Sequence, residues 1–387
     1  MTNRLIDFAT AGQIIFGNGQ LQALNDVISS HGKRALIVKG KEKPDPDHFF
    51  SLLQKMDVSP SIFTVDREPD QQMITKGISI GRKNRCDFVI GFGGGAVIDT
   101  GKAISAMLNN EGDLMDYLEI VGKGLPLSSP SLPYIAIPTT AGTGSEVTKN
   151  AVISIPDRRV KVSLRNAYLL PRIAIVDPEL TLSVPKNVTA STGMDAFTQV
   201  IEPYVTNSPN PLVDLFCREA IPLAARNLFL AYSEGHNISA RESMAYVSLL
   251  GGLSLANAKL GTVHGFAGPI GGMFHAPHGM ICAAILPAAM QVNAEILART
   301  DDNLDKAFRF REIARWVTGS NVAEIADGVK WIAELAKSMQ IPGLSYFGIS
   351  ESDFPSIIEK AEHSSSMKGN PVRLSKTDME RILTMSM

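Results

Sequence analysis

The chain has 387 residues, of which 44% are hydrophobic and 20% are charged. This length is enough for two domains, because a single hydrophobic core stops growing at roughly 250–300 residues. With 37 basic residues against 39 acidic ones, the formal net charge is −2. That balance argues against nucleic acid or an anionic membrane as a partner, since both require an excess of basic side chains.

Three cysteines, Cys86, Cys217 and Cys282, lie far apart in the sequence. They form neither a disulfide framework nor a CxxC metal knuckle, which favours a reducing compartment. The first residues lack the apolar core of a signal peptide, and residues 280–292, the most apolar stretch, are too few and too interrupted by proline to span a membrane. We therefore expect a cytoplasmic, globular protein with no membrane partner.

The first half of the chain alternates short runs rich in β-branched residues with longer amphipathic segments. This alternation is typical of parallel βαβ units with helices covering a sheet. The expected strands are residues 34–40, 61–65, 87–92, 133–138 and 172–177, and the expected helices include residues 18–30 and 96–108. The pattern predicts an α/β domain.

Residues 91–96, Gly-Phe-Gly-Gly-Gly-Ala, join one expected strand to the helix that follows it. Glycines in such a turn allow backbone N–H groups to approach an anion closely, and the helix N-terminus adds a favourable dipole. The turn formally matches the dinucleotide pattern GxGxxA, although that fingerprint normally follows the first strand of its domain. A phosphate-binding turn and a tight turn without a ligand both stay open.

A second loop, residues 138–146, also follows an expected strand. Its sequence, Pro-Thr-Thr-Ala-Gly-Thr-Gly-Ser-Glu, offers hydroxyl groups that suit phosphates, ribose or a nicotinamide amide. Loops that follow strands of one parallel sheet meet at its carboxyl edge, where open α/β folds bind ligands. We therefore expect the two loops to meet and to bind a nucleotide.

The pattern changes after Pro185. Strand-like runs are missing, and the remaining segments carry alanine, leucine and methionine at helical spacing. The expected helices are residues 187–205, 211–230, 240–258, 279–299 and 323–339. We therefore divide the chain into an α/β domain of residues 1–184 and an all-helical domain of residues 185–387.

Histidines gather in the second half. His264, His275 and His278 lie within fifteen residues, and Asp195 and Gln199 lie four apart in an expected helix, so that both project from one face. A carboxylate and two or more imidazoles are suitable ligands for a divalent ion such as Fe²⁺ or Zn²⁺. Any one histidine taken alone is better explained as an ordinary capped or core imidazole. A buried carboxylate, however, is costly unless it is paired or binds a cation.

Together these segments resemble the iron-containing (group III) alcohol dehydrogenases, which belong to the dehydroquinate synthase-like superfamily. The resemblance covers nearly the whole chain and keeps the family's order of motifs. The matching segments are residues 16–19, 93–95 with Asp99 and Lys102, 138–146, 177–180, 193–195, 277–279 and 370–373. The resemblance implies an α/β, Rossmann-like N-terminal domain for the dinucleotide and an all-α C-terminal domain for metal and substrate.

The resemblance also implies roles for particular residues. The family's cofactor contacts fall on Gly93, Gly94, Gly95, Asp99, Thr139, Thr140, Thr143 and Lys161, and three of its four metal ligands fall on Asp195, His264 and His278.

Two positions depart from the family. The fourth ligand, usually histidine, is Gln199, whose amide oxygen is a poorer ligand for a transition metal than imidazole and weakens the case for iron over zinc. Four residues after His264, where the family commonly has a histidine thought to help move the proton, this chain has Gly268. His275 is a candidate replacement proton carrier, or else a solvent-facing loop histidine.

The segment after the expected strand 34–40 bears on the choice of cofactor. NAD-preferring members of the family have an aspartate here, which accepts the ribose 2′-hydroxyl and repels a 2′-phosphate. This chain has Gly40 between Lys39 and Lys41, which removes the repulsion and offers positive charge to a 2′-phosphate. The pattern favours NADP over NAD, unless the two lysines belong to a solvated turn.

The resemblance thus predicts a metal-dependent oxidoreductase that transfers hydride between NAD(P)(H) and a small alcohol, aldehyde or ketone, with His275 and His278 as catalytic residues. Two alternatives stay open: a metal-independent reductase of the maleylacetate type, and a paralogue that binds a dinucleotide without turnover. Maleylacetate reductases tend to lose the aspartate that this chain keeps as Asp195. The family commonly forms dimers or larger assemblies, so a homo-oligomer is also expected.

Overall fold

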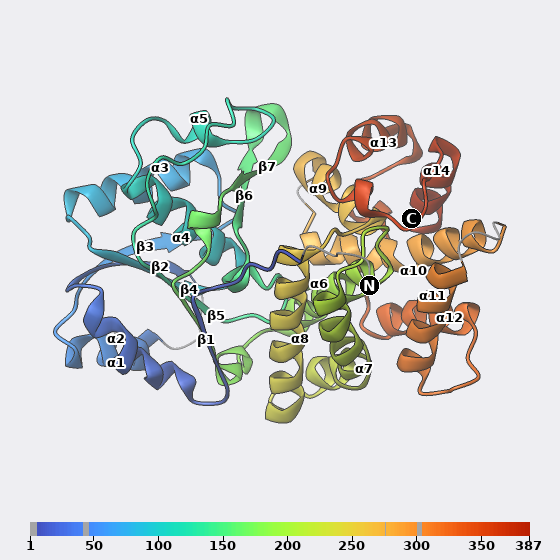
Figure 1. Cartoon of the computed structure of the whole chain (residues 1–387), viewed down its shortest axis with the longest axis horizontal. Coiled ribbons are helices and arrows are strands. Elements are labelled where there is room, and N and C mark those ends of the chain that lie inside the picture. Colours follow the sequence, from blue (N-terminus) through green and yellow to red (C-terminus); the bar gives the residue numbers. More distant parts are fainter. Residues whose placement is uncertain (1–5, 42–45, 275, 300–303) are drawn as a thin grey trace. The chain divides into compact units, whose positions relative to one another are not determined.

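The computed structural model describes residues 6–41, 46–274, 276–299 and 304–387. They fold into two compact units (Figure 1). Residues 8–184 form the first, which we call the α/β unit. Residues 185–387, together with Ile6 and Asp7, form the second, which we call the helical unit. Each unit contains its own group of candidate functional residues.

A six-stranded parallel sheet forms the α/β unit, with the strand order β1-β8-β5-β4-β2-β3. Its strands are β1 (Gln13–Phe16), β2 (Arg34–Gly40), β3 (Ser59–Val65), β4 (Phe88–Gly93), β5 (Tyr134–Pro138) and β8 (Ile173–Val176). β4 is buried along its whole length, as a strand covered on both faces must be. The parallel sheet confirms the predicted α/β class and each of the predicted strands.

Helices cover both faces of this sheet. α2 (Pro46–Lys55) places Phe49 in the core cluster on one face, whereas α3 (Gln71–Lys83) and α4 (Gly95–Leu108) place Ile74 and Ile98 in the cluster on the other. The connections that leave the neighbouring strands β2 and β4 therefore diverge to opposite faces. In open α/β sheets, ligands bind in the crevice at such a divergence, beyond the carboxyl ends of the strands.

The prediction of one helix over residues 18–30 is wrong. The structure has a 3₁₀ turn (Gln20–Ala23), the single-turn helix α1 (Leu24–Val27) and a second 3₁₀ turn (Ile28–Ser30). Asparagine, aspartate and serine in this segment compete for backbone hydrogen bonds and so disfavour a continuous helix.

Some short elements were not predicted from the sequence. Besides β1, these are α5 (Leu114–Tyr117) and an antiparallel pair, β6 (Asn150–Ile155) and β7 (Val160–Arg165), that is separate from the main sheet. Each has too few residues, or too weak an alternation, for its period to be read with certainty.

The described part of the helical unit contains only helices and loops (Figure 1). Its helices are α6 (Lys186–Val205), α7 (Pro211–Ser233), α8 (Ile238–Asn257), α9 (Thr262–Phe274), α10 (His278–Leu297), α11 (Leu304–Thr318), α12 (Ile325–Ser338), α13 (Phe354–Glu362) and α14 (Lys376–Met385). The predicted helices after Pro185 are confirmed as α6, α7, α8, α10 and α12. α6 is buried on almost every side, because α7, α8 and α10 pack around it.

Among the described helices, α10 alone is long and apolar enough to cross a membrane. However, 67% of its most apolar stretch is buried inside the structure, where α6, α9 and α12 contact it. These are the properties of a core helix, and they account for the apolar stretch at residues 280–292.

Candidate active site

Polar side chains enter the core of the helical unit from α6. Asp195, Gln199 and Glu202 lie at positions i, i+4 and i+7 of this helix, so one face presents all three, and all three are buried. Burial raises the pKa of Asp195, but the charge of His278 and hydrogen bonds that include one from the Gln199 amide outweigh it. The pKa of the Asp195 carboxyl therefore lies below its ordinary value.

His264, in the first turn of α9, is held by Glu202. One oxygen of Glu202 accepts a hydrogen bond from ring Nδ1 at 2.6 Å, and the other accepts one from the backbone N–H of Val263, also at 2.6 Å. Because Nδ1 is committed to Glu202, Nε2 is the nitrogen that faces Asp195, 3.4 Å from Oδ1. Burial lowers the pKa of His264, but the two carboxylates outweigh it and raise the pKa to about 9.

His278 is the first residue of α10, and its Nε2 lies 3.7 Å from Asp195 Oδ1. The approach depends on the following residue, Gly279. A Cβ atom at that position would lie only 2.1 Å from the backbone oxygen of Ser191 on α6. Glycine therefore allows the N-terminus of α10 to pack against α6 closely enough to bring His278 to the aspartate.

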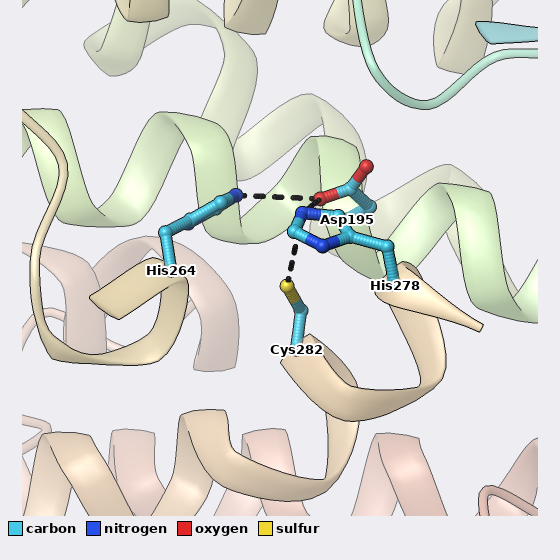
Figure 2. A group of neighbouring side chains, drawn as sticks. All are labelled: Asp195, His264, His278 and Cys282. Atoms are coloured by element: carbon cyan, nitrogen blue, oxygen red, sulfur yellow. Dashed lines mark hydrogen bonds and ion pairs between the residues drawn. The ribbon is translucent and has the colours of Figure 1, made fainter. Parts of the chain in front are cut away.

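Cys282 lies one turn further along α10, and its Sγ is 3.8 Å from His278 Nε2. Figure 2 shows the four side chains of Asp195, His264, His278 and Cys282 converging from α6, α9 and α10. One ligand atom from each lies within 4.8 Å of those of the other three. Burial, reinforced by nearby carboxylates, raises the pKa of the Cys282 thiol.

Two buried atoms of this cluster, Asp195 Oδ1 and His264 Nε2, have no hydrogen-bond partner among the residues that the structure describes. Their side chains are only 3% and 7% exposed, so bulk water does not replace the missing partners. An unsatisfied buried polar group costs about 1–3 kcal/mol. A divalent cation satisfies a carboxylate oxygen and imidazole nitrogens at once, so this donor set fits a metal such as Zn²⁺ or Fe²⁺.

The structure thus brings together Asp195, His264 and His278, with Gln199 beside the aspartate. Gly268 lies one turn after His264 on α9, and no atom of the described residues lies within 4 Å of a Cβ atom placed there. Crowding at that Cβ therefore does not explain the missing imidazole. His275 lies outside the described residues.

Two members of the cluster were not predicted. Cys282 was considered only as a possible disulfide or knuckle cysteine, and Glu202 was not given a role. The spacing of four between His278 and Cys282, and of seven between Asp195 and Glu202, places each pair on one helix face and is the signal that would have found them.

In the α/β unit, the two predicted loops do meet. β4 and β5 pair in parallel with Gly93 opposite Pro138, so the loops that follow them begin side by side. The backbone N–H of Thr139 donates to the carbonyl of Gly93 at 3.0 Å.

Glycine is needed where these loops touch. A Cβ atom on Gly94 would lie 3.3 Å from Thr140 Oγ1, and one on Gly95 would lie 2.8 Å from Thr143 Oγ1. Gly94 is the N-cap of α4, and no side chain caps this helix start. The first N–H groups of α4 and two threonine hydroxyls therefore surround a place suited to a phosphate group.

Asp99 and Lys102 serve the interior of the unit. Asp99 accepts hydrogen bonds from the Ser145 hydroxyl and from the backbone N–H of Val152, the latter at 2.9 Å. Lys102 is fully buried, and its ammonium donates to the carbonyl of Asn150 at 2.7 Å. Asp99 thus braces the second loop, and its direct contact with a cofactor stays a prediction.

The remaining predicted cofactor residues lie at strand ends and on the β6–β7 pair. Gly40 ends β2, next to β4, and its carbonyl accepts a hydrogen bond from Lys39 Nζ at 3.0 Å. Lys41 is exposed. Lys161 lies on β7 and forms an ion pair with Glu68. The roles of these residues in cofactor binding stay predictions.

Two family models match the chain. The model described as iron-containing alcohol dehydrogenase matches residues 11–178, and the one described as Fe-containing alcohol dehydrogenase family, C-terminal, matches residues 189–387. Together they cover both units and confirm the resemblance that the motifs indicate.

Individual relatives match over their full length. The 1,3-propanediol dehydrogenase of Citrobacter freundii is 34% identical over 390 residues, which cover 99% of each chain. The NADPH-dependent butanol dehydrogenase of Clostridium saccharobutylicum is 31% identical over 395 residues, which cover 98% of this chain and 97% of the relative. A crystal structure of a 1,3-propanediol oxidoreductase has a TM-score of 0.91 at 31% identity and covers 99% of this chain and 100% of its own.

Proposed function

Because this chain belongs to the iron-containing alcohol dehydrogenase family and is therefore an oxidoreductase, we propose that it transfers hydride between NAD(P)(H) and a small alcohol, aldehyde or ketone, assisted by a divalent metal. The observation that carries the metal dependence is the convergence of Asp195, His264 and His278 in a buried cluster with unsatisfied donor atoms.

The proposed ligands act as one preorganised set. A bound divalent cation supplies Lewis acidity, which stabilises negative charge that develops on the substrate oxygen during hydride transfer. Asp195 contributes the anionic oxygen, Glu202 fixes the ring of His264 so that Nε2 faces the cluster, and His278 contributes a second imidazole. Gln199, at the family's fourth ligand position, hydrogen-bonds to Asp195 and restrains its carboxylate.

The α/β unit is the proposed binding site for the nicotinamide cofactor, which carries the hydride. The N–H groups at the start of α4 would bind the pyrophosphate, since Gly94 and Gly95 leave room for close approach. The hydroxyls of Thr140 and Thr143 lie beside these glycines and would add hydrogen bonds. Asp99, on α4 after the first loop, would hold the second loop in place by accepting a hydrogen bond from the Ser145 hydroxyl.

Proton transfer needs a group that reaches solvent. We assign it to His275, because a histidine that binds no metal exchanges protons near neutral pH. His278 would be a further catalytic residue through the cation that it binds. The His278 side chain is 36% exposed and so contacts both solvent and the cluster.

Gly40, Lys39 and Lys41 support NADP as the preferred cofactor. Their sequence lacks the carboxylate that repels a 2′-phosphate. Relatives include enzymes named for either coenzyme. The ratio of kcat/KM for NADPH over NADH should exceed one in the parent and fall at least tenfold in Gly40→Asp, because the new carboxylate repels the phosphate. A parent that prefers NADH would contradict this assignment.

The three free cysteines further support a cytosolic location, and we propose a homo-oligomer as the family commonly forms. Sedimentation of the purified protein would give the number of subunits.

The main test combines Asp195→Ala with elemental analysis of the purified parent. We expect stoichiometric metal in the parent, and loss of both metal and NAD(P)H-dependent carbonyl reduction in the variant. Asp26→Ala, at an exposed position on α1, is the matched control and should keep both. Unchanged activity in Asp195→Ala with a metal-free parent would indicate a maleylacetate-type reductase. Dinucleotide binding without turnover of a broad carbonyl panel would indicate a degenerate paralogue.

A further inference from the structure

Cys282 lies among the proposed metal ligands, although no family motif in this chain accounts for it. We propose that its sulfur is the fourth protein ligand of the cation, in the role that an imidazole at position 199 would otherwise have. This inference rests on the metal-dependent function proposed above and adds to it a ligand and a metal preference.

The position of Cys282 on α10 makes this role possible. His278 and Cys282 are one helical turn apart and therefore share a helix face. The Cys282 side chain is fully buried, and in Figure 2 it points toward the other three side chains rather than into the packing behind α10. The same short helix segment thus carries two donors, and Gly279 between them lets both reach α6.

The spacing of the donor atoms fits tetrahedral coordination. With Zn–N of about 2.0–2.1 Å and Zn–S of about 2.3 Å, two ligand atoms of one tetrahedral zinc lie about 3.3–3.6 Å apart. The observed separations are 3.4 Å from His264 Nε2 to Asp195 Oδ1, 3.7 Å from His278 Nε2 to Asp195 Oδ1, and 3.8 Å from Cys282 Sγ to His278 Nε2. These three separations lie within a few tenths of an ångström of the tetrahedral values, and every pair of ligand atoms in the group lies within 4.8 Å, so small side-chain adjustments bring all four atoms to one cation.

A second, independent observation indicates that the space between these four side chains binds a ligand. Asp195 Oδ1 and His264 Nε2 point into it while buried, and no described residue forms a hydrogen bond with either atom. The thiol is therefore not an isolated cysteine in a core. It faces the same space as two donor atoms that only a cation or a proton satisfies.

Cys282 is also a better donor than the residue at the family's fourth position. The amide N–H of Gln199 donates a hydrogen bond to Asp195, so that Gln199 could offer a cation only its neutral carbonyl oxygen. Thiolate sulfur binds Zn²⁺ and Co²⁺ readily, whereas a neutral amide oxygen suits harder cations. On binding, the thiol would release its proton to solvent as the metal–sulfur bond forms, with no change in oxidation state. The set of one carboxylate, two imidazoles and one thiolate favours Zn²⁺ over Fe²⁺.

The test uses Co²⁺ and Zn²⁺ as probes of the full-length protein after chelation. The Co²⁺ form of the parent should show the intense near-ultraviolet band of thiolate-to-cobalt charge transfer. The Zn²⁺ form should show sulfur at about 2.3 Å in its X-ray absorption spectrum. Cys282→Ser should lose both signals while still binding metal through its other ligands. Cys217→Ser, at a buried free cysteine on α7, is the matched control and should keep both.

The outcomes separate this inference from the proposed function. Stoichiometric binding by the parent with only nitrogen and oxygen neighbours overturns the Cys282 ligand and leaves the metal-dependent function in place. A charge-transfer band that persists in Cys282→Ser also overturns it. A parent that binds neither probe overturns both proposals. The X-ray absorption spectrum is recorded on the parent protein, so it tests the proposal even if Cys282→Ser folds poorly.

Discussion

At the scale of single residues, the proposed metal cluster depends on a carboxylate, Glu202, that does not itself face the other donors. Glu202 accepts a hydrogen bond from His264 Nδ1, the ring nitrogen that faces away from Asp195. It also accepts a hydrogen bond from the backbone N–H of Val263. The negative charge of Glu202 makes the imidazole a stronger donor, and its geometry determines which nitrogen is offered. Glu202 therefore acts on His264 through both its position and its charge.

We therefore expect Glu202→Gln to weaken Zn²⁺ affinity by about 10- to 100-fold, since outer partners of a ligand histidine typically contribute that much. The amide oxygen still accepts from Nδ1, but the amide lacks the charge, and its NH2 group cannot accept from the backbone N–H of Val263. Competition with a chromophoric chelator measures the affinity. Glu359→Gln, at an exposed position on α13, is the control and should leave it unchanged. Equal affinity in Glu202→Gln and the control would remove Glu202 from the metal site.

A second buried carboxylate determines how the α/β unit responds to pH. Glu146 ends the second loop, and burial raises its pKa from the ordinary 4.5 to about 7. Between these two values the unfolded chain releases this proton while the folded chain keeps it. The contribution of Glu146 to the free energy of unfolding therefore falls as the pH rises from about 4.5 to 7, and it stays low above pH 7.

The Glu146→Gln variant should be free of this loss. Relative to the parent it should gain on the order of 3 kcal/mol in free energy of unfolding between pH 5 and pH 8, from a shift of about 2.5 pKa units. Urea unfolding at the two pH values gives the difference. If the parent and the variant differed in free energy of unfolding by the same amount at pH 5 and at pH 8, Glu146 would be ionised at both pH values and its raised pKa would be wrong.

The candidate ligands were predictable to different degrees. Asp195 and the two histidines could be named from residue type, order and family resemblance. Cys282 and Glu202 could not, because their importance depends on which face of α6 or α10 meets the cluster. That face is set by packing between helices that are far apart in the sequence.

At the scale of elements, the close packing of α10 on α6 controls the site. Gly279→Ala would place a methyl group 2.1 Å from a backbone oxygen that cannot move aside easily. The N-terminus of α10 must shift, and His278 and Cys282 shift with it. We expect a loss of about 1–3 kcal/mol in stability and a large loss of metal affinity.

Gly268→Ala provides the matched comparison, because nothing lies within 4 Å of its added methyl group. Calorimetry and metal titration of both variants test the difference. If Gly279→Ala bound metal as tightly as Gly268→Ala, the approach of α10 to α6 would not be what brings His278 to Asp195.

Element prediction succeeded where the period was long and regular, as in α6, α7 and the buried strands β4 and β5. It failed at residues 18–30, where polar residues and short turns replace one expected helix. It also missed β6 and β7, whose pairing lies outside the main sheet and leaves no pattern of burial on two faces.

At the scale of the whole molecule, two units with separate cores are each proposed to bind a different ligand. A ligand stabilises the unit that binds it, by about 2.7 kcal/mol at a concentration 100 times its dissociation constant. Both tryptophans of the chain, Trp316 and Trp331, belong to the helical unit, so their fluorescence reports that unit alone.

Chelation should therefore lower the melting temperature seen by tryptophan fluorescence, and added Zn²⁺ should restore it. In Asp195→Ala neither treatment should have an effect. If chelation left the fluorescence transition of the parent unchanged, the metal would not be bound by the helical unit.

The most direct measurement is anomalous diffraction from crystals of the purified protein at the zinc and iron absorption edges. The proposed metal-dependent mechanism predicts one strong peak within bonding distance of Asp195, His264 and His278. Absence of a peak there, in a protein that reduces carbonyl substrates at full rate in the presence of a chelator, would contradict it.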